Sequence, residues 1–407
     1  MKKLLKLNPH ALTISIAALI FVVLGALRAF HAKNDFVPVY AGTRCLLHGC
    51  NPYGTGELLY PPSTLLVLFP LALLDYPTAW LIWFLLNGAL FVTAVVLVLS
   101  LCPRLHRWLA TALGAVLLAG SSQLLILAQP SAFAVSTVVI GVYFFLRGQA
   151  LLLGSILLTL SLAIKPQIGG LIVLYLFFKG IHRRYAAQAM AGTLTIILSG
   201  GLILRMHPQS ADWVSDLRAN LSMATAPGAT DDPRPANGQA SAALNLQTIT
   251  SIFFSDEKGF NDAAYVIFTL LFAAWAVAAL RMNPTMENHL LSLGVLSVLT
   301  LLPIYHRNYD SRFLILSIPA ALIVYEKRRF VGAFLCVLVA LATVSIQHWI
   351  QLVLQKEGLL ESVQQDRPLF TLLLRESGLR LLVLSCLFMV ALFNIRAPKD
   401  SRRGQVV

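Results

Sequence analysis

The sequence predicts an all-α protein that crosses a membrane many times. Of its 407 residues, 57% are hydrophobic and 12% are charged, whereas a soluble domain carries about 25% charged residues. The mean hydropathy is +0.76, and apolar runs of membrane-spanning length recur from Ala11 to the C-terminal tail. We therefore expect one polytopic integral membrane domain, residues 1–407, with about twelve transmembrane helices and extracytoplasmic loops.

The placement of the basic residues accounts for the net charge of +13 without a nucleic-acid partner. They gather in short links between apolar runs, which is the positive-inside pattern and predicts that both termini face the cytoplasm. The links contain Lys2, Lys3 and Lys6; Arg104 and Arg107; Lys179, Arg183 and Arg184; Lys327, Arg328 and Arg329; and Arg396, Lys399, Arg402 and Arg403.

The apolar runs define the expected spans in chain order. The first, residues 10–30, is too long for a secretory signal and lacks a small-residue cleavage site, so we expect it to be retained. Pro70 interrupts the next run, residues 61–75, which is expected to be re-entrant or tilted. Further spans are expected near 77–101, 108–128, 130–146, 149–164, 168–179, 186–206, 263–281, 287–304, 312–325, 330–350 and 377–396.

Polar segments between these runs are the expected loops. Residues 31–60 form a first external loop, in which Cys45 and Cys50 are either disulfide-bonded or free thiols. The segment 207–262 contains "ATAPGATDDPRPANGQAS", a composition that predicts a mobile external loop without its own core. Residues 351–375 form a further external segment, and 397–407 a cytoplasmic tail.

Polar residues at the external ends of the apolar runs are the candidate functional groups. Charges inside a bilayer are costly and usually functional, yet no Asp or Glu falls within an apolar run. This disfavours a proton-coupled transporter. Three patches are expected to face one side of the membrane: "NDFVPVYAGTRCLLHGCNPY" (34–53), Lys165 in "LSLAIKPQIGG", and "YHRNYDSR" (305–312). An acid, cations and aromatic rings at one interface suit an anionic, lipid-linked sugar.

Each patch also has a plainer interpretation. Asp35 can cap a short helix that begins near Phe36, and Lys165 can extend its ammonium group to the membrane interface. The "YHRNYDSR" stretch can be a charged turn with an internal salt bridge. Tyr60 and Tyr76 are typical of an interfacial aromatic belt.

The motifs together resemble a known family. "ND" after the first span, "YAGTRCLLHGCNPY" and "YPPSTLLVLFPLALLDYPTAWLIWFLLN" are similar to the start of glycosyltransferase family 87 proteins, and "LSLAIKPQIGGLIVLYLFFKGIHRR" resembles their "KP" segment. The similarity covers about the first 185 residues. It implies a GT-C-type fold and transfer of a hexose, most often mannose, from a polyprenyl-monophosphate donor on the extracytoplasmic face. "YHRNYD" departs from the stretch expected there, which leaves the acceptor undefined.

The family's catalytic acid corresponds to Asp35, which we expect to be the general base of an inverting single displacement. Asp310 is expected to pair with Arg312 rather than to act as a second nucleophile. The candidate ligands of the donor phosphate are Lys165, His306, Arg307 and Arg44. The candidate sugar- and acceptor-binding residues are Asn51, Tyr53, Tyr40, Gln167, Asn245 and Tyr309.

No cofactor or metal is expected, since the Asp231–Asp232 pair is interpreted as a solvated turn. The expected partners are the lipid bilayer of the plasma (inner) membrane, the polyprenyl-phosphate sugar and a glycolipid or glycan acceptor. Two rival functions remain open from the sequence. One is a flippase or transporter of a lipid-linked saccharide, and the other an enzyme like O-antigen ligase or polymerase that uses a polyprenyl diphosphate donor.

Overall fold

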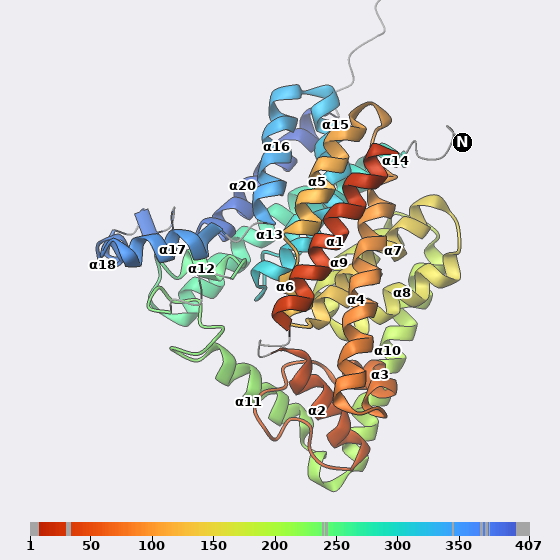
Figure 1. Cartoon of the computed structure of the whole chain (residues 1–407), viewed down its shortest axis with the longest axis vertical. Coiled ribbons are helices and arrows are strands. Elements are labelled where there is room, and N and C mark those ends of the chain that lie inside the picture. The colour runs from red at the N-terminus through yellow and green to blue at the C-terminus, as the bar shows by residue number, and fades with distance from the viewer. Residues whose placement is uncertain are drawn as a thin grey trace, which may run out of the picture.

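Helices make up the described part of the chain, as the sequence predicts (Figure 1). This computed structural model describes residues 8–29, 34–237, 240, 243–343, 346–366, 369–370, 373 and 375–395. Within them the only extended pairing is an isolated antiparallel bridge between Ala243 and Arg307. The basic residues before residue 8 and after 395, and the tail 397–407, lie outside the described residues.

The helices follow one another with short connections up to residue 206. They are α1 (Pro9–Ala29), α2 (Phe36–Leu47), α3 (Pro62–Ala72), α4 (Tyr76–Leu99), η1 (Arg104–His106), α5 (Arg107–Ala119), α6 (Gln123–Ile126), α7 (Pro130–Arg147), α8 (Leu151–Ile164), α9 (Pro166–Phe178) and α10 (Arg183–Met206). The second half contains η2 (Pro208–Ser210), α11 (Trp213–Thr225), α12 (Gln247–Thr250), α13 (Glu257–Arg281), α14 (Met286–Leu299), η4 (Asn308–Leu316), α15 (Ser317–Lys327), α16 (Arg329–Ala342), α17 (Ile346–Lys356), α18 (Leu360–Gln365) and α20 (Glu376–Ile395).

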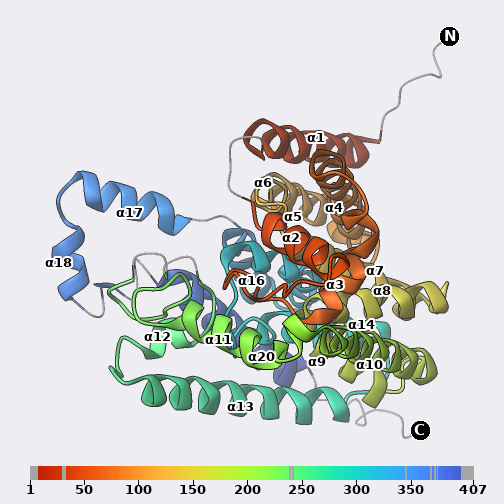
Figure 2. The same ribbon diagram turned by 90° about the horizontal axis from the view of Figure 1, so that it is seen from below.

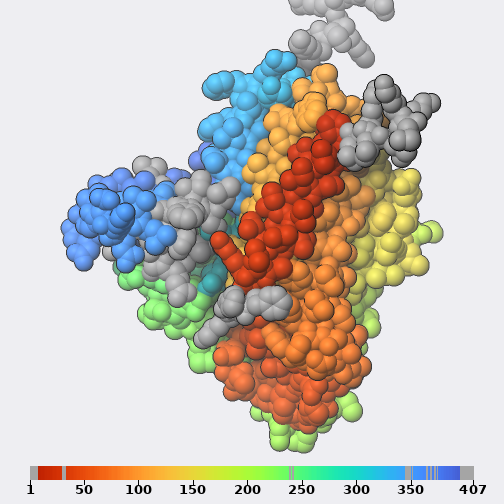
Figure 3. Space-filling model, viewed as in Figure 1, coloured from red at the N-terminus to blue at the C-terminus, as the bar shows by residue number. Residues whose placement is uncertain are grey.

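Seven helices of the described residues are long and apolar enough to cross a membrane. They lie at Pro9–Ala29, Tyr76–Leu99, Arg104–Ile126, Pro130–Arg147, Arg183–Met206, Glu257–Arg281 and Glu376–Asn394. α1 lies on the outside of the bundle (Figure 3), where Leu19 and Leu27 are 63% and 67% exposed, as expected for side chains that face lipid. The chain is thus a multi-pass membrane protein. The count of about twelve spans stays a prediction, because α3, α8, α9, α14 and α16 are shorter apolar helices.

The described basic links meet at one end of the bundle. There the start of α1 contacts the start of α5, and the end of α15 lies beside the starts of α5 and α14. The end of α9 contacts the end of α13 at this end of the bundle too. The contacts are His10 Nδ1 to Thr111 Oγ1 at 2.9 Å, the rings of His106 and Tyr325 at 5.0 Å, the Lys327–Glu287 ion pair, and Lys179 Nζ to the Ala279 carbonyl at 3.0 Å.

α2, α3 and α11 lie together at the opposite end, which is the lower end of Figure 1. The turn at Asn51 and Tyr53 holds α11 there. Asn51 Nδ2 donates to Asp216 Oδ2 at 2.8 Å, and the Tyr53 ring stacks on Trp213 at 6.3 Å. The buried Asn220 of α11 donates to the Tyr53 and Leu58 carbonyls at 3.0 and 3.2 Å. The "NPY" turn is therefore an anchor for α11.

The expectation that residues 207–262 form a mobile loop without its own core does not describe the fold. α11 and α12 lie within this segment, and residues 243–252 are buried. Composition misled here because the Pro- and Gly-rich stretch is held by contacts with residues distant in sequence. In the first external loop, Cys45 and Cys50 are joined by a disulfide with a Cα–Cα distance of 5.0 Å.

Two expected spans are divided in the structure. The span expected at 330–350 ends with α16 at Ala342, and α17 is a separate helix that projects from the bundle with α18 (Figures 1 and 2). Its sequence "IQHWIQLVLQK" alternates polar and apolar residues at helical spacing, which suits an interface rather than a lipid interior. The span expected at 312–325 consists of η4 followed by α15.

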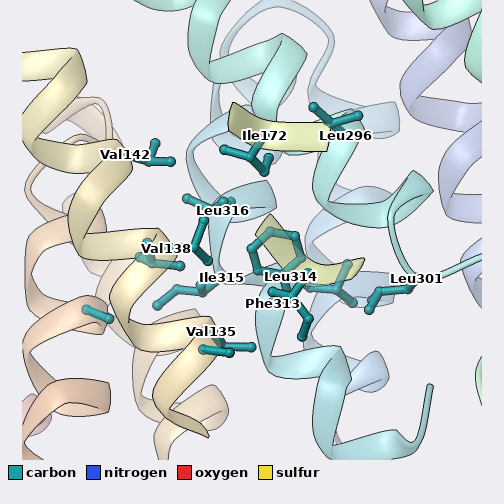
Figure 4. Packing of buried hydrophobic residues seen from close by; sticks show 14 of the residues in the cluster. Val135, Val138, Val142, Ile172, Leu296, Leu301, Phe313, Leu314, Ile315 and Leu316 are labelled. Atoms are coloured by element: carbon teal, nitrogen blue, oxygen red, sulfur yellow. The ribbon is translucent and has the colours of Figure 1, made fainter. Parts of the chain in front are cut away.

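η4 is buried between other helices. Its apolar end, residues 313–316, packs beside Val135 and Val138 of α7 and close to Leu301, which follows α14 (Figure 4). The side chains from Phe313 to Leu316 are at most 4% exposed. This packing fixes the polar start of η4, residues 308–312, at the end of the bundle opposite the basic links.

We expect Asn220→Ala to loosen the contact between α11 and the Asn51–Tyr53 turn. The substitution leaves two carbonyls without their donor, at a cost of about 1–3 kcal/mol. The measurement is the rate of protease cleavage between residues 207 and 237 in detergent micelles, which should rise. Ser222→Ala, on the exposed side of the same helix, is the control. Equal cleavage of the two variants would contradict the anchoring role.

Candidate active site

Lys165 and Asp310 form a buried ion pair. Lys165 lies where α8 ends and α9 begins, because Pro166 has no amide hydrogen to continue α8. Its Nζ lies 2.8 Å from both Asp310 carboxylate oxygens and 2.8 Å from Ser131 Oγ. Lys165 is 8% exposed and Asp310 1%. Since an ammonium group has three N–H donors, these partners use all of them.

Further donors surround the Asp310 carboxylate. His306 Nδ1 lies 3.0 Å from Oδ2, and the Arg307 amide donates to the same oxygen at 3.3 Å. The expected Asp310–Arg312 salt bridge was wrong: the Arg312 guanidinium donates to the Asn308 and Gly120 carbonyls and to Ser311 Oγ. Both oxygens of Asp310 thus accept hydrogen bonds from the protein, and the residue is 1% exposed, which disfavours its attack on a substrate.

The end of α8 also positions the start of α3. The carbonyls of Ala163 and Ile164 are released where α8 stops, and two hydroxyl groups of α3 donate to them. Ser63 Oγ lies 2.6 Å from the Ala163 oxygen, and Thr64 Oγ1 lies 3.2 Å from the Ile164 oxygen. Both donors are fully buried, so this contact holds Tyr60, just before α3, near Lys165.

Asp35 occupies the N-cap position of α2, but its carboxylate makes no capping hydrogen bond. The interpretation of Asp35 as a helix cap was therefore wrong. Asn34 caps instead, since its Oδ1 accepts from the Val37 amide at 3.2 Å. The Asp35 amide donates to the Leu127 carbonyl at 2.8 Å, while its carboxylate has no hydrogen-bond partner in the described part of the chain.

The electrostatics of Asp35 suit a proton acceptor. Burial raises the pKa of its carboxyl above the usual value, Arg307 and Lys165 oppose that rise, and Asp231 adds to it. A carboxylate with a raised pKa and no bound donor is a better base than an exposed aspartate. The same interactions show that Arg307, Lys165 and Asp231 all lie within electrostatic reach of Asp35.

The turn that precedes α7 connects Asp35 to Lys165. Leu127 holds the Asp35 amide, and Ser131 accepts from Lys165. Between them Ala128 has a φ of 47°, a conformation that costs energy for a residue with a Cβ atom. Trp83 Nε1 donates to the Ala128 carbonyl at 3.0 Å, and the Phe36 ring stacks on Trp83 at 5.6 Å. The turn and this stack fix the start of α2 beside the ion pair.

Arg307 presents the free cationic edge of the site. Its Nε donates to the Tyr305 hydroxyl, and its Nη2 donates to Asp231 Oδ1 at 3.3 Å. Nη1 has no partner among the described residues, and the side chain is 28% exposed. The guanidinium can therefore accept an oxyanion without losing an existing bond, which Lys165 cannot do.

Two tyrosines line the same region. The Tyr309 ring lies 5.7 Å from Lys165 Nζ. Burial raises the pKa of the Tyr60 and Tyr309 phenols, and the nearby charges of Asp35 and Asp310 raise it further. Both hydroxyls thus stay protonated beside Asp35. Tyr60 therefore lies within electrostatic reach of Asp35 and Asp310, and its interpretation as an interfacial belt residue stays a prediction.

Four other candidates have contacts elsewhere. Arg44 Nη1 donates to the Ala72 carbonyl at 3.3 Å, and the Tyr40 hydroxyl to the Leu74 carbonyl at 2.7 Å. Arg44 follows Asp35 by nine residues of helix, roughly 13 Å along its axis, and makes no ion pair with it. Asn51 and Tyr53 bind α11, as described above. Their roles in binding substrate stay predictions that these contacts do not favour.

Gln167 and Asn245 lie at the edge of the site. Gln167 is half-buried in the first turn of α9, two residues from Lys165. Asn245 is buried, and the neighbouring Leu244 amide donates to the His306 carbonyl at 2.8 Å. Asn245 Oδ1 has no partner among the described residues. Their proposed contacts with a sugar remain predictions.

Asp231 and Asp232 do not form a solvated turn. Asp232 is 2% exposed and accepts from the amides of Gly228 and Arg234 at 2.8 and 3.1 Å and from Arg234 Nη1 at 2.9 Å. Asp231 faces Arg307. The composition did not reveal the partner of Asp231, since Arg307 lies 76 positions away, nor the burial of the local turn around Asp232. Among the described residues no group of three His, Cys, Asp or Glu could hold a metal ion, and the expectation that none is needed stays a prediction.

The lengths of α8 and α9 set the depth of the site. α8 has 14 residues and α9 has 13, so each rises about 20 Å. Both run between the end with the basic links and Lys165. A bilayer's hydrocarbon core is about 30 Å thick. Lys165 and Asp310 therefore lie about 20 Å along the bundle from the end with the basic links, which is less than the thickness of the hydrocarbon core.

The fold and the cluster around Asp35, Lys165 and Asp310 define a polytopic membrane protein with an acid-and-cation site at one end of its bundle. The sequence profile of glycosyltransferase family 87 matches residues 58–303, which is more than half of the chain. The chain therefore belongs to glycosyltransferase family 87 and is a membrane glycosyltransferase. This confirms the family that the motifs indicated.

The matched range differs from the region of resemblance in the sequence. It includes Tyr60, Lys165 and Asp231 but excludes Asp35, the "NPY" turn and the η4 residues. No curated protein and no solved structure shows a significant match to the chain. The roles of Asp35 and Arg307 thus depend on the geometry of this site.

We expect Asp310→Asn to destabilise the protein by about 3–5 kcal/mol, because it leaves the Lys165 charge buried without its partner. A second change, Lys165→Met, should recover most of that loss by removing the charge. The measurement is thermal unfolding in micelles. The control is Glu287→Gln with Lys327→Met, since that pair is about 40% exposed and should contribute about 1 kcal/mol or less. A double variant as unstable as Asp310→Asn alone would contradict this account.

Proposed function

We propose that the protein transfers a hexose, in particular mannose, from a polyprenyl-monophosphate donor to a lipid or glycan acceptor by inverting single displacement. One observation carries the proposal. In a family 87 chain, the Asp35 carboxylate has no hydrogen-bond partner among the described residues and lies within electrostatic reach of Arg307, whose Nη1 has none either. A base for the acceptor and a cation for the departing phosphate are what this reaction needs.

Asp35 acts on the acceptor. Its carboxylate accepts the proton of the acceptor hydroxyl while the hydroxyl oxygen attacks the anomeric carbon of the sugar. The bond from that carbon to the phosphate oxygen breaks, and the electron pair leaves with the polyprenyl phosphate. The raised pKa of Asp35 makes it a stronger base for this step than an exposed aspartate.

Arg307 is the principal phosphate ligand in this proposal. Its free Nη1 carries two N–H groups that can donate to phosphate oxygens, and such charge-assisted hydrogen bonds are strong. Lys165 adds positive charge to the site without binding the phosphate directly, because Asp310 and Ser131 hold its ammonium group in place. His306 supports the pair by donating to Asp310, so its contribution to phosphate binding is indirect.

The stereochemistry follows from which carboxylates are free. Retention through a covalent intermediate requires a second carboxylate that can act as the nucleophile. Asp310 is bound by Lys165, His306 and the Arg307 amide, and Asp231 is bound by the Arg307 side chain. Among the described carboxylates of this cluster, Asp35 is the one that accepts no hydrogen bond, which supports inversion.

The aromatic side chains are the proposed sugar contacts. Tyr60 and Tyr309 keep their phenolic protons and can donate hydrogen bonds to sugar hydroxyls. Gln167 and Asn245 can contribute amide groups from the edge of the site. We propose that these four residues distinguish mannose from other hexoses.

The distribution of charge supports the orientation. The basic links lie together at the end of the bundle opposite Asp35, and basic loops face the cytoplasm. We therefore propose that the site opens to the extracytoplasmic face of the plasma (inner) membrane, with both termini in the cytoplasm. The donor's polyprenyl tail would remain in the bilayer while its phosphate binds Arg307.

Asp35→Asn should abolish transfer while the protein still folds. Loss of a general base costs on the order of 10²–10⁴-fold in rate. The assay uses purified protein in proteoliposomes, radiolabelled polyprenyl-phosphate mannose, and a membrane extract from the host as the acceptor. The control is Asp262→Asn, an exposed carboxylate on α13, which should transfer as well as the unmodified chain.

Two results would count against the proposal. Full transfer by Asp35→Asn would remove Asp35 as the base. A lack of transfer by the unmodified chain from this donor, together with transfer from a polyprenyl diphosphate sugar, would replace the proposed donor class.

A further inference from the structure

We infer that Asp231 is a positioning residue of this site: it orients the Arg307 guanidinium toward the donor phosphate and keeps the two cations of the site from suppressing Asp35 as a base. The inference rests on the proposed function, since it assigns Asp231 a task only if Arg307 binds phosphate and Asp35 accepts a proton. It gives a role to a residue that the sequence indicated to be part of a solvated turn.

The segment around Asp231 is fixed by buried contacts on its far side. Asp232 organises it by accepting from Gly228 and Arg234. Asn237 Nδ2 donates to the carbonyls of Ala229 and Asp232 at 2.9 and 2.8 Å. These bonds close the segment from Gly228 to Asn237 into a turn, so the backbone that carries Asp231 is held in place.

Two side chains from other elements hold this turn against the bundle. Ser251 Oγ, which follows α12, donates to the Pro233 carbonyl at 2.8 Å. Arg375, before α20, donates through Nη2 to the Arg234 carbonyl at 3.1 Å and is 2% exposed. Buried polar groups of this kind are costly to leave unpaired, so the turn is not free to swing away from Arg307.

The direction of Arg307 depends on this fixed carboxylate. Nη2 is bonded to Asp231 Oδ1 at 3.3 Å and to the Thr230 carbonyl at 3.4 Å, while Nε is bonded to the Tyr305 hydroxyl. With these two nitrogens held, the guanidinium plane is set and Nη1 remains for the substrate. A neutral residue at position 231 would weaken the bond to Nη2 and leave the bond from Nε to Tyr305.

Asp231 also balances the charges around Asp35. The groups that face Asp35 are Arg307 and Tyr309 from η4 and its preceding turn, Lys165 from the start of α9, Tyr60 from the segment before α3, and Asp231. Arg307 and Lys165 lower the pKa of Asp35, and Asp231 raises it. Removing the Asp231 charge would therefore lower that pKa and weaken the base.

The test is the pH dependence of transfer by Asp231→Asn. Asp35 must be ionised to accept a proton, so the rate falls as the pH drops through its pKa. A lower pKa moves this acid limb to lower pH. We also expect the maximal kcat/KM to fall about 10-fold or more, because Arg307 loses a fixed partner and the base is weaker.

Asp231→Glu and Asp212→Asn are the matched variants. Asp231→Glu keeps the charge and should restore the acid limb close to its original pH, even where the longer side chain raises KM for the donor. Asp212→Asn makes the same charge change at an exposed aspartate next to α11 and should leave the profile unmoved. If Asp231→Asn fails to fold, as judged by thermal unfolding, Asp231→Ser carries the same prediction.

The outcomes separate this inference from the proposed function. An unmoved acid limb in a folded Asp231→Asn variant, with the unmodified chain active and Asp35→Asn inactive, would overturn the inference alone. An unmodified chain that does not use the polyprenyl-phosphate donor, or an active Asp35→Asn variant, would overturn the proposed function beneath it.

Discussion

The ion pair between Lys165 and Asp310 is the interaction on which the arrangement of the site depends. A single charge within the depth of a bilayer is very costly, whereas two opposite charges with shared hydrogen bonds can be accommodated. The pair therefore requires the break between α8 and α9, the start of α7 and the start of η4 to meet. His306 and Arg307 precede Asp310 by four and three residues, so the same pair brings them to the site. Burial of the apolar end of η4 supports this placement from the other side.

The sequence allowed the membrane class and the family to be predicted, and the reason is physical. Polar residues at the ends of apolar runs have few places to go in a bilayer, so an acid, cations and aromatic rings were expected at one interface. Lys165, Arg307 and Tyr309 do lie within electrostatic reach of Asp35, and His306 contacts Asp310, while their roles stay predictions. The sequence did not reveal their partners. Lys165 and Asp310 are 145 positions apart, and the nearby Arg312 was a more obvious partner for Asp310 by spacing alone.

The "ND" and "NPY" motifs show a second limit of sequence reasoning. Asn34 and Asp35 are adjacent and both favoured at helix caps, yet Asn34 caps α2 and leaves the acid free. Asn51 and Tyr53 are polar and close to the site in sequence, but their partners are in α11. A motif identifies which residue types matter, while the three-dimensional contacts determine which of them stabilise the fold and which face a substrate. The Pro- and Gly-rich segment that contains Asp231 was misread for the same reason.

The shortness of α8 and α9 has a consequence for the lipids around the protein. A helix shorter than the surrounding hydrocarbon layer is accommodated when the bilayer thins beside it. Leu152, Leu153 and Ile156 of α8 are 47–62% exposed, so this side of the bundle faces lipid. Lipid head groups at the end of the bundle that holds Lys165 would then lie closer to its level. A long-chain lipid phosphate would approach Lys165 by lateral diffusion in a locally thinned membrane, without its tail ever entering water.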